Sequence, residues 1–169
     1  MKYEGIIIRP PSEAYSLLLQ VTVGCSHNRC TFCPTYKGVK FRIKSPEEIS
    51  EDIQAARRYR QVEKVFLCDG DALIIPQARL LDILRQLKES LPDLKRVGLY
   101  GNAKSILRKS REELGELREL GLGIVYLGVE SGHEDVLRYI RKGVSPDQLV
   151  EAGRRVKDAG ITLSVTVIL

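Results

Sequence analysis

Apolar residues follow two alternating patterns along this chain. Five runs are almost continuously apolar and rich in β-branched residues, which is typical of strands buried on both faces of a parallel sheet. These predicted strands are Ser16–Val23, Lys64–Cys68, Arg96–Tyr100, Ile124–Val129 and Thr162–Leu169. Between them, apolar residues recur every three or four positions, which predicts helices that bury one face.

Four amphipathic helices are predicted, and the sequence marks several of their ends. Their apolar positions are Ile49, Ile53 and Ala56; Leu80, Leu84, Leu87 and Leu91; Leu114 and Leu117; and Leu149, Ala152, Val156 and Ala159. Ser45, Ser110 and Ser145 are each followed three residues later by Glu or Gln, the capping-box pattern of a helix start. Gly121 and Gly160 follow the third and fourth helices, where a glycine commonly ends a helix.

The alternation of strands and helices predicts an α/β fold with a parallel sheet that curves toward a barrel. The 169 residues suffice for one domain with a real core, and no linker or low-complexity tract divides them. The last predicted strand, Thr162–Leu169, has no helix after it. Because a bare apolar edge promotes aggregation, we expect a truncated protein, self-association through this strand, or cover from another chain.

Composition and the first residues of the chain indicate the class of protein and its compartment. A hydrophobic share of 43% and a charged share of 29% are ordinary for a globular protein. The longest apolar runs have strand length, so we expect no membrane span. No secretory signal precedes Ser12, so we expect a cytoplasmic protein whose cysteines stay reduced.

Three cysteines lie close together directly after the first predicted strand. Cys25, Cys30 and Cys33 form a C-x4-C-x2-C motif in a glycine-containing loop. Thiolates packed so closely can reach one soft metal centre, and iron–sulfur clusters are commonly held by such runs. A structural zinc ion needs four protein ligands, whereas three cysteines leave one iron of a cubane open for a ligand. The motif therefore predicts a reactive centre.

This motif resembles that of the radical S-adenosylmethionine (radical SAM) superfamily, C-x3-C-x-aromatic-C. Cys30-Thr31-Phe32-Cys33 matches its second half, while the first spacing is one residue longer, an expansion that costs a loop little. The resemblance implies a partial (β/α)6 TIM-like barrel, of which five strands are present. Residues 1–15 would be an N-terminal extension, and residues 16–169 a core domain incomplete at its C-terminus.

The resemblance also implies a chemistry. Cys25, Cys30 and Cys33 would hold a [4Fe-4S] cluster, and S-adenosylmethionine (SAM) would bind its open iron. Reductive cleavage of SAM would give a 5′-deoxyadenosyl radical that abstracts hydrogen from a substrate, with a reductant protein as electron donor. Phe32 would line the adenine of SAM; the alternative for Phe32 is plain packing.

Further candidate residues follow the second predicted strand. Ligands of parallel α/β folds bind at the carboxyl ends of the strands. Asp69-Gly70-Asp71 lies where the superfamily carries its Gly-Gly-Glu-like motif, with Asp69 in place of the first glycine. Gly70 permits close backbone approach, and Asp71 would accept the methionine ammonium. The alternative is a plain turn, in which Asp69 bonds its own backbone.

Glu130 and Ser131, after the fourth predicted strand, resemble the superfamily's ribose-binding segment. A carboxylate there can accept both ribose hydroxyls. Ser131 has a structural alternative, because it could N-cap a short helix over His133–Ile140 with Glu134 as its capping-box partner. Glu130 directly follows an apolar strand, so its carboxylate must find water or a ligand.

Other residues near the motif have open roles. Cys68 is expected to be a small buried hydrophobe and not a fourth ligand. His27 could reach a metal, but the short loop disfavours it. Tyr36, Lys37 and Arg42 are expected to face substrate or to stabilise the anionic cluster.

The segment from His27 to Lys44 carries five cations and no acid, within a chain of net charge +5. The cations are Arg29, Lys37, Lys40, Arg42 and Lys44. They would either create positive potential beside the cysteine loop or form a solvated edge. Nucleic-acid binding is weakly supported, because no aromatic-interleaved basic repeat accompanies the charge.

Two other classes of protein remain as alternatives. One is a zinc-binding module that uses the three cysteines and His27. The other is a non-catalytic iron–sulfur protein. Neither needs the polar loops after the second and fourth strands, so the radical SAM enzyme is the favoured hypothesis.

Overall fold

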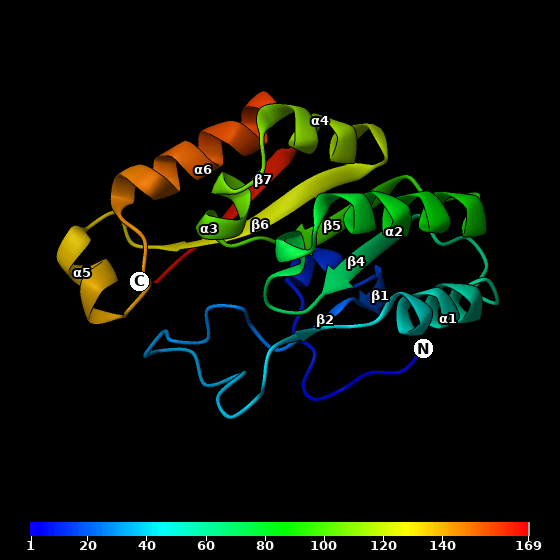
Figure 1. Ribbon diagram of the computed structural model, residues 1–169, viewed down its shortest axis with the longest axis horizontal. Coiled ribbons are helices and arrows are strands. Elements are labelled where there is room, and N and C mark those ends of the chain that lie inside the picture. Colours follow the sequence, from blue (N-terminus) through cyan, green and yellow to red (C-terminus); the bar gives the residue numbers. More distant parts are fainter. Residues whose placement is uncertain (169) are drawn as a thin grey trace.

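Five parallel strands in the order β1-β4-β5-β6-β7 form the central sheet of the computed structural model, which describes residues 1–168 (Figure 1). The strands are β1 (Leu17–Gln20), β4 (Lys64–Cys68), β5 (Arg96–Tyr100), β6 (Leu122–Glu130) and β7 (Thr162–Val167). All four pairings are parallel, and β1 and β7 are the edges. The predicted parallel α/β sheet is confirmed, and it is open rather than closed into a barrel.

The first predicted strand is interrupted at Val21. After β1 the chain continues into β2 (Thr22–Val23), which pairs antiparallel with β3 (Arg42–Ile43). Strand β3 was not predicted, because two residues are too short to show a pattern. The β2–β3 ribbon joins the two ends of the loop that carries the three cysteines. At the other end of the chain, Leu169 of the last predicted strand lies outside the described residues.

Six α-helices accompany the sheet in the described part of the chain. They are α1 (Pro46–Ala56), α2 (Gln77–Ser90), α3 (Ala103–Leu107), α4 (Arg111–Glu119), α5 (Glu134–Tyr139) and α6 (Pro146–Asp158). Ser45, Ser110 and Ser145 form reciprocal capping boxes at the starts of α1, α4 and α6, as predicted. Gly121 and Gly160 follow α4 and α6 with φ of 103° and 72°, as a helix-ending glycine should. No helix within residues 1–168 is long and apolar enough to cross a membrane.

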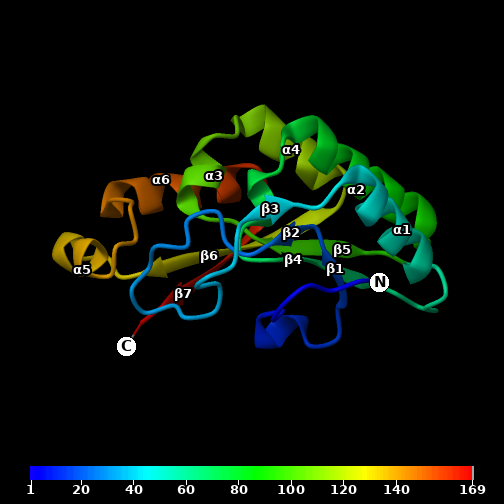
Figure 2. The same cartoon turned by 60° about the horizontal axis from the view of Figure 1, so that its bottom comes forward.

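The helices cover one face of the sheet and leave the other face to the N-terminal segment (Figure 2). The helix-covered face holds the large aliphatic core, to which α1, α2, α4 and α6 contribute their buried leucines and isoleucines. The opposite face carries a smaller cluster that includes Phe66, Cys68 and Tyr126. Phe66 makes edge-to-face contacts with Tyr100 and Tyr126, at centroid distances of 5.1 and 5.7 Å. Cys68 is fully buried in this cluster, as expected for a small hydrophobe.

The N-terminal segment is tied to that second face by buried polar contacts. Glu13 of the 3-10 helix η1 (Pro11–Glu13) is completely buried. Its carboxylate accepts a hydrogen bond of 2.5 Å from the Tyr126 hydroxyl and pairs with Arg96 at 2.5 Å. Nearer the start of the chain, the Gln20 side chain bonds both the N–H and the carbonyl of Glu4. Residues 1–15 therefore pack as part of the sheet's second layer.

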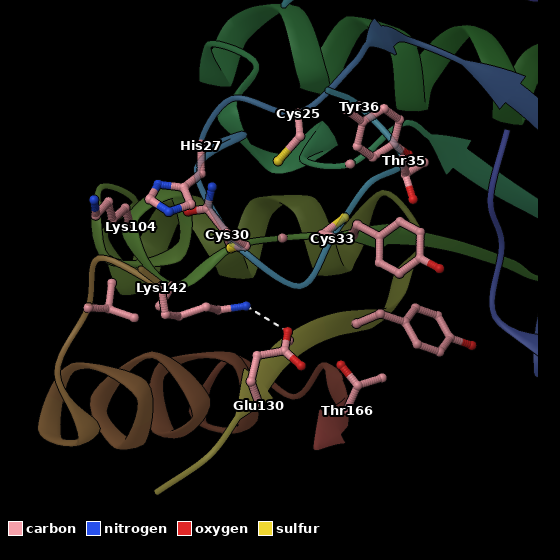
Figure 3. Close-up of a pocket in the computed structure, with 18 of the residues that line it drawn as sticks. Cys25, His27, Cys30, Cys33, Thr35, Tyr36, Lys104, Glu130, Lys142 and Thr166 are labelled. Carbon is pink, nitrogen blue, oxygen red and sulfur yellow. Dashed lines mark hydrogen bonds and ion pairs between the residues drawn. The ribbon is translucent and has the colours of Figure 1, made fainter. Parts of the chain in front are cut away.

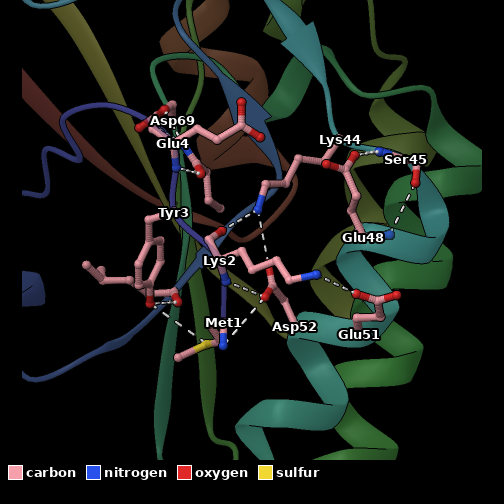
Figure 4. Close-up of polar contacts among 12 residues, drawn as sticks. Met1, Lys2, Tyr3, Glu4, Lys44, Ser45, Glu48, Glu51, Asp52 and Asp69 are labelled. Carbon is pink, nitrogen blue, oxygen red and sulfur yellow. Dashed lines mark hydrogen bonds and ion pairs between the residues drawn. The ribbon is translucent and has the colours of Figure 1, made fainter.

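Two cations of the predicted basic stretch belong to the fold rather than to an exposed positive edge. Lys44 is 1% exposed, and its Nζ pairs with Asp52 at 3.0 Å and donates to the Lys2 carbonyl at 2.6 Å (Figure 4). Arg42 donates two bonds of 2.8 Å to Glu48, the capping-box acid of α1. The expectation that Arg42 faces substrate or the cluster is therefore wrong, because its guanidinium is engaged at the start of α1.

Candidate functional site

A cavity of about 240 Å³ opens at the carboxyl ends of the strands, beside the cysteine loop (Figure 3). Its walls come from the segments that follow β2, β4, β5 and β6, with additional side chains from β7 and the N-terminal segment. The residues that line it include Cys25, His27, Cys30, Phe32, Cys33, Tyr36, Gly70, Tyr100, Tyr126, Gly128, Glu130 and Lys142. This location agrees with the prediction that polar loops after successive strands share one site.

The cysteine loop has a fixed path because its own backbone and a neighbouring helix hold it. Gly24 begins the loop with φ of 77°, a conformation that glycine adopts at little cost. The Asn28 side chain donates to the Tyr36 carbonyl at 2.7 Å and so folds the loop back on itself. Thr31 N–H donates to the carbonyl of Ile140, just beyond α5, at 3.0 Å. The loop is thereby anchored both internally and to the α5 end of the molecule.

The three loop thiols are free, half-buried and directed into the same cavity (Figure 3). Burial raises the pKa of the Cys30 thiol, and the nearby Lys142 ammonium opposes that rise. Within residues 1–168, no three His, Cys, Asp or Glu side chains come close enough to share a single metal ion. A zinc ion draws each sulfur to about 2.3 Å from one point. Thiolates are also the ligands that hold iron–sulfur clusters.

Gly70 forms the edge of the cavity beside Cys25, and only glycine fits there. A Cβ at this position would lie 2.9 Å from Tyr36 Cε2 and 3.0 Å from Cys25 Cβ. The Gly70 N–H donates to the Gly24 carbonyl at 3.2 Å, which ties the β4 loop to the cysteine loop. The sequence predicted that Gly70 allows close approach of the backbone. In the structure the Gly70 backbone lies against the protein's own cysteine loop and also borders the cavity.

Asp69 and Asp71, on either side of Gly70, do not face the cavity. Asp69 accepts hydrogen bonds from Gln20 Nε2 at 2.8 Å and from the Tyr36 hydroxyl at 3.4 Å. Its carboxylate therefore bonds these two side chains, where the plain-turn alternative expected it to bond its own backbone.

Asp71 is completely buried and lies behind the cysteine loop. Its carboxylate accepts from Ser26 Oγ at 2.5 Å, Asn102 Nδ2 at 2.7 Å, Ser105 Oγ at 2.7 Å and Asn102 N at 3.1 Å. Burial raises the pKa of Asp71, and the bonds from Ser26 and Ser105 oppose that rise. The structure thus corrects the expectation that Asp71 is open to an ammonium group, because its oxygens are already engaged. Asp71 instead joins the cysteine loop to the start of α3.

Glu130 lines the cavity and forms an ion pair that the sequence did not predict. Its Oε1 accepts from Lys142 Nζ at 2.7 Å, and both side chains are largely buried (Figure 3). Lys142 follows α5 in a loop with no recognisable motif. The pair could have been predicted from burial, because an acid at the end of a buried strand needs a donor and Lys142 lies in the loop after the next helix.

The backbone at Glu130 is bent to present its side chain to the cavity. Glu130 has φ of 65°, and Ser131 N donates to the Val129 carbonyl at 2.8 Å, so Glu130 is the centre of a three-residue γ-turn. Such a conformation in a residue other than glycine costs about 1–3 kcal/mol and is commonest at functional sites. Gly128 leaves room for the pair: a Cβ there would overlap Glu130 Oε1 and lie 2.8 Å from Lys142 Nζ.

Ser131 lies apart from the cysteine cavity, on an apolar groove between α6 and β7. Its hydroxyl accepts from His133 N at 3.1 Å. The N-cap of α5 is His133, whose Nδ1 accepts from Asp135 N at 3.3 Å. The structure therefore corrects both expectations for Ser131, because the γ-turn at Glu130 directs the chain away before Ser131 is reached.

The other predicted neighbours of the motif have distinct places. Phe32 is 43% exposed on the cavity wall, and Tyr36 is buried there. His27 also lines the cavity, with Nε2 bonded to the Arg141 carbonyl at 2.8 Å, and burial lowers its pKa. Lys37 Nζ donates to the Asn28 carbonyl within the loop. Cys68 lies away from the cavity, with its thiol directed at the Phe66 carbonyl.

Comparison with known proteins identifies one family. The sequence model of the Radical SAM superfamily matches residues 19–169. An uncharacterized methyltransferase of Pyrococcus horikoshii is 26% identical over 141 residues, which cover 82% of this chain and 29% of the relative. The 4′-phospho-dehydrooxetanocin synthase of Priestia megaterium is 25% identical over 173 residues, covering 91% of this chain and 23% of the relative. The chain thus spans less than a third of the length of either relative.

Solved structures share the fold. The cobalamin-dependent S-adenosylmethionine radical enzyme OxsB superposes with a TM-score of 0.73 at 24% identity, over 90% of this chain and 23% of that one. Methylornithine synthase (PylB) superposes with a TM-score of 0.66 at 18% identity, over 90% of this chain and 44% of that one. The open five-stranded sheet therefore corresponds to part of a larger barrel-like architecture in these proteins.

Proposed function

This chain belongs to the radical SAM superfamily, and from that premise we propose that its three loop cysteines hold the superfamily's cluster in the cavity described above. Members of the superfamily are enzymes that use a [4Fe-4S] cluster and SAM. Cys25, Cys30 and Cys33 fit the cluster by donor type, by their free thiols and by their shared cavity. These three thiols on one cavity are the observation that carries the proposal.

The protein's contribution at the cluster is to fix the loop and to balance its charge. A cluster held by three thiolates would carry negative charge, and the Lys142 ammonium lies close enough to oppose the rise in the Cys30 pKa that burial causes. The loop itself is held by the Asp71 network behind it and by the Gly70 backbone beside it. These contacts keep the three thiols oriented before any ligand arrives, which is the main means by which a protein tunes such a centre.

SAM would bind along the same cavity, which residues at the ends of β5 and β6 line. Lys142 engages Oε1 of Glu130, and Oε2 can accept a ribose hydroxyl. The ring of Phe32, exposed on the cavity wall, provides an apolar surface for the adenine. Gly70 and the cysteine loop would hold the methionine end, and the buried Asp71 carboxylate would take no direct part.

A cluster held by Cys25, Cys30 and Cys33 would supply the electron for reductive cleavage of SAM to methionine and a 5′-deoxyadenosyl radical, which would abstract hydrogen from a substrate. The chain's own residues limit competing reactions. Tyr100 and Tyr126 form an aromatic wall that reduces water access to the cavity, as a reactive intermediate requires. An external reductant protein supplies the electron.

Binding of SAM to the cluster-loaded protein tests this placement, with Glu130→Gln as the variant and Ser131→Ala as its matched control. Glu130→Gln removes a charge-assisted acceptor, so SAM affinity should fall roughly tenfold to a hundredfold. Ser131→Ala, one residue along but outside the cavity, should bind SAM normally. Equal affinity in Glu130→Gln and the parent protein would refute the ribose contact, and equal loss in both variants would point to a general disturbance of the β6 end.

A further inference from the structure

A second hollow, the basic cleft, lies on the outer side of the cysteine loop, between that loop, α3 and the end of α5. Its volume is about 1010 Å³, and none of its lining residues is an Asp or Glu. The charged residues that line it are Arg29, Lys37, Lys104, Arg108, Arg138 and Arg141. Cations gathered in a concave surface raise the local positive potential and attract anionic partners.

Most of these cations are not neutralised within the protein. Arg138 is the exception, since it pairs with Glu134 and Asp135 on α5. Across residues 1–168, the other five form no ion pair with a carboxylate. These five positive charges are therefore available to an anionic partner.

The wall of the cleft is the cysteine loop itself. Ser26, His27, Asn28 and Arg29, the residues that connect Cys25 to Cys30, all line the basic cleft. His27 and Lys104 line both the cleft and the cysteine cavity, as Figure 3 shows for their side chains beside the thiols. A partner seated in the cleft is thus separated from the three thiols by the thickness of one loop.

The character of the surface indicates a protein partner. The five unpaired cations are exposed, which suits steering and rim contacts more than a desolvated small-molecule site. The buried hydroxyl at the cleft, Ser105, is already committed to Asp71. No Phe, Tyr or Trp lines the cleft, so the stacking surface that single-stranded nucleic acids use is missing from this part of the described chain.

We infer that the basic cleft is the docking surface for an acidic electron-carrier protein that reduces the cluster. This inference rests on the proposed function, because it is the cluster that needs the electron. One electron passes from the carrier's reduced cofactor to the cluster across the loop Ser26–Arg29; the carrier is oxidised by one electron and no proton or leaving group moves. Electron-transfer complexes are small and weak, and depend strongly on charge complementarity.

A flavodoxin, an acidic flavin-carrying electron-transfer protein, is the probe for this surface. Its binding to the cluster-loaded protein is measured by calorimetry at low and at moderate salt. The double variant Arg108→Glu/Arg141→Glu should weaken binding at least about tenfold at low salt, and binding of the parent should weaken as salt rises. Arg57→Glu/Arg60→Glu, with the same charge change at exposed positions beyond α1, is the matched control and should bind almost normally.

Two further measurements separate this inference from the proposed function. Iron content and SAM cleavage driven by dithionite, which needs no docking, should be equal in Arg108→Glu/Arg141→Glu and the parent. SAM cleavage driven by flavodoxin should fall in that variant alone. Equal flavodoxin affinity in the parent and Arg108→Glu/Arg141→Glu would overturn the docking surface, even where dithionite-driven activity confirms the enzyme. Tighter, competing binding of a single-stranded RNA of about twenty nucleotides would also overturn it.

Discussion

Replacing Asp71 by alanine removes one buried carboxylate that accepts four hydrogen bonds from three residues. The donors are Ser26 on the cysteine loop and Asn102 and Ser105 at the start of α3. In the alanine variant these donors lose Asp71 as an acceptor, and Ser26 keeps only the hydrogen bond that Asn102 Nδ2 donates to its hydroxyl at 3.0 Å. We expect both a less stable protein and a looser cysteine loop.

The size of the effect follows from two opposed terms. Each charge-assisted hydrogen bond contributes about 1.5–3 kcal/mol, so the four together contribute several kcal/mol. Burying a carboxylate with no ion-pair partner costs several kcal/mol, which alanine recovers; the burial that raises the pKa of Asp71 reflects this cost. The orphaned donors dominate, and the net loss should be about 2–4 kcal/mol, a large part of a stability of about 5–15 kcal/mol.

Urea unfolding of the metal-free protein measures this loss as a lower midpoint with an unchanged slope. The cluster-loaded variant should also release iron to a chelator several times faster than the parent protein, since the loop has lost one of its anchors. Asp93→Ala, at an exposed aspartate, is the matched control and should change neither quantity. If Asp71 instead contacted the methionine ammonium of SAM, stability and iron release would be unchanged while SAM affinity fell roughly tenfold or more. That result would refute the anchoring role.

Three other changes have defined outcomes. Lys142→Met should destabilise the protein by about 2–4 kcal/mol, because it leaves the Glu130 carboxylate buried without its cation; a double-mutant cycle with Glu130→Gln should show coupling, and additive effects would refute the pair. Lys44→Met should cost about 2–4 kcal/mol in thermal unfolding, because Asp52 loses its closest cation and keeps only the Lys2 N–H and the N-terminal ammonium at 3.7 Å; an unchanged midpoint would contradict the buried pair. Hydrogen bonds from Arg42 and from the Ser45 backbone lower the pKa of Glu48 to about 2. Its stabilising contribution is thus present above the unfolded-state pKa and is lost as the pH falls toward 2, so Glu48→Gln should show a shallower loss of stability on acidification. An identical acid profile would contradict this.

The elements that the sequence predicted are those with a pattern of their own. Strands β4 and β5 were predicted with the correct ends, because continuous apolar runs are buried on both faces of the sheet. The capping boxes predicted three helix starts, because the interacting groups are three residues apart. Helix α3 (Ala103–Leu107) was missed, since its five residues make little more than one turn and are too few to repeat an apolar pattern.

Long-range contacts explain the errors at the site. The partners of Asp71 lie 31 to 45 residues away, so no local pattern distinguishes an anchored carboxylate from an open one. Lys142 meets Glu130 only through the strained turn at the end of β6. The three cysteines were found because the ligand spacing is local, whereas the role of each acid depends on the packing of several loops.

Iron and sulfide content after anaerobic reconstitution most directly tests whether Cys25, Cys30 and Cys33 hold the cluster. The parent protein and Cys68→Ala, whose thiol is buried away from the cavity, should each bind about four irons and equal sulfide, with the electron paramagnetic resonance signal of a reduced [4Fe-4S] centre. Alanine at any one of the three loop positions should lose most of the iron and that signal. Full iron and sulfide loading in all three loop variants, or zinc without sulfide in the parent protein, would contradict the assignment.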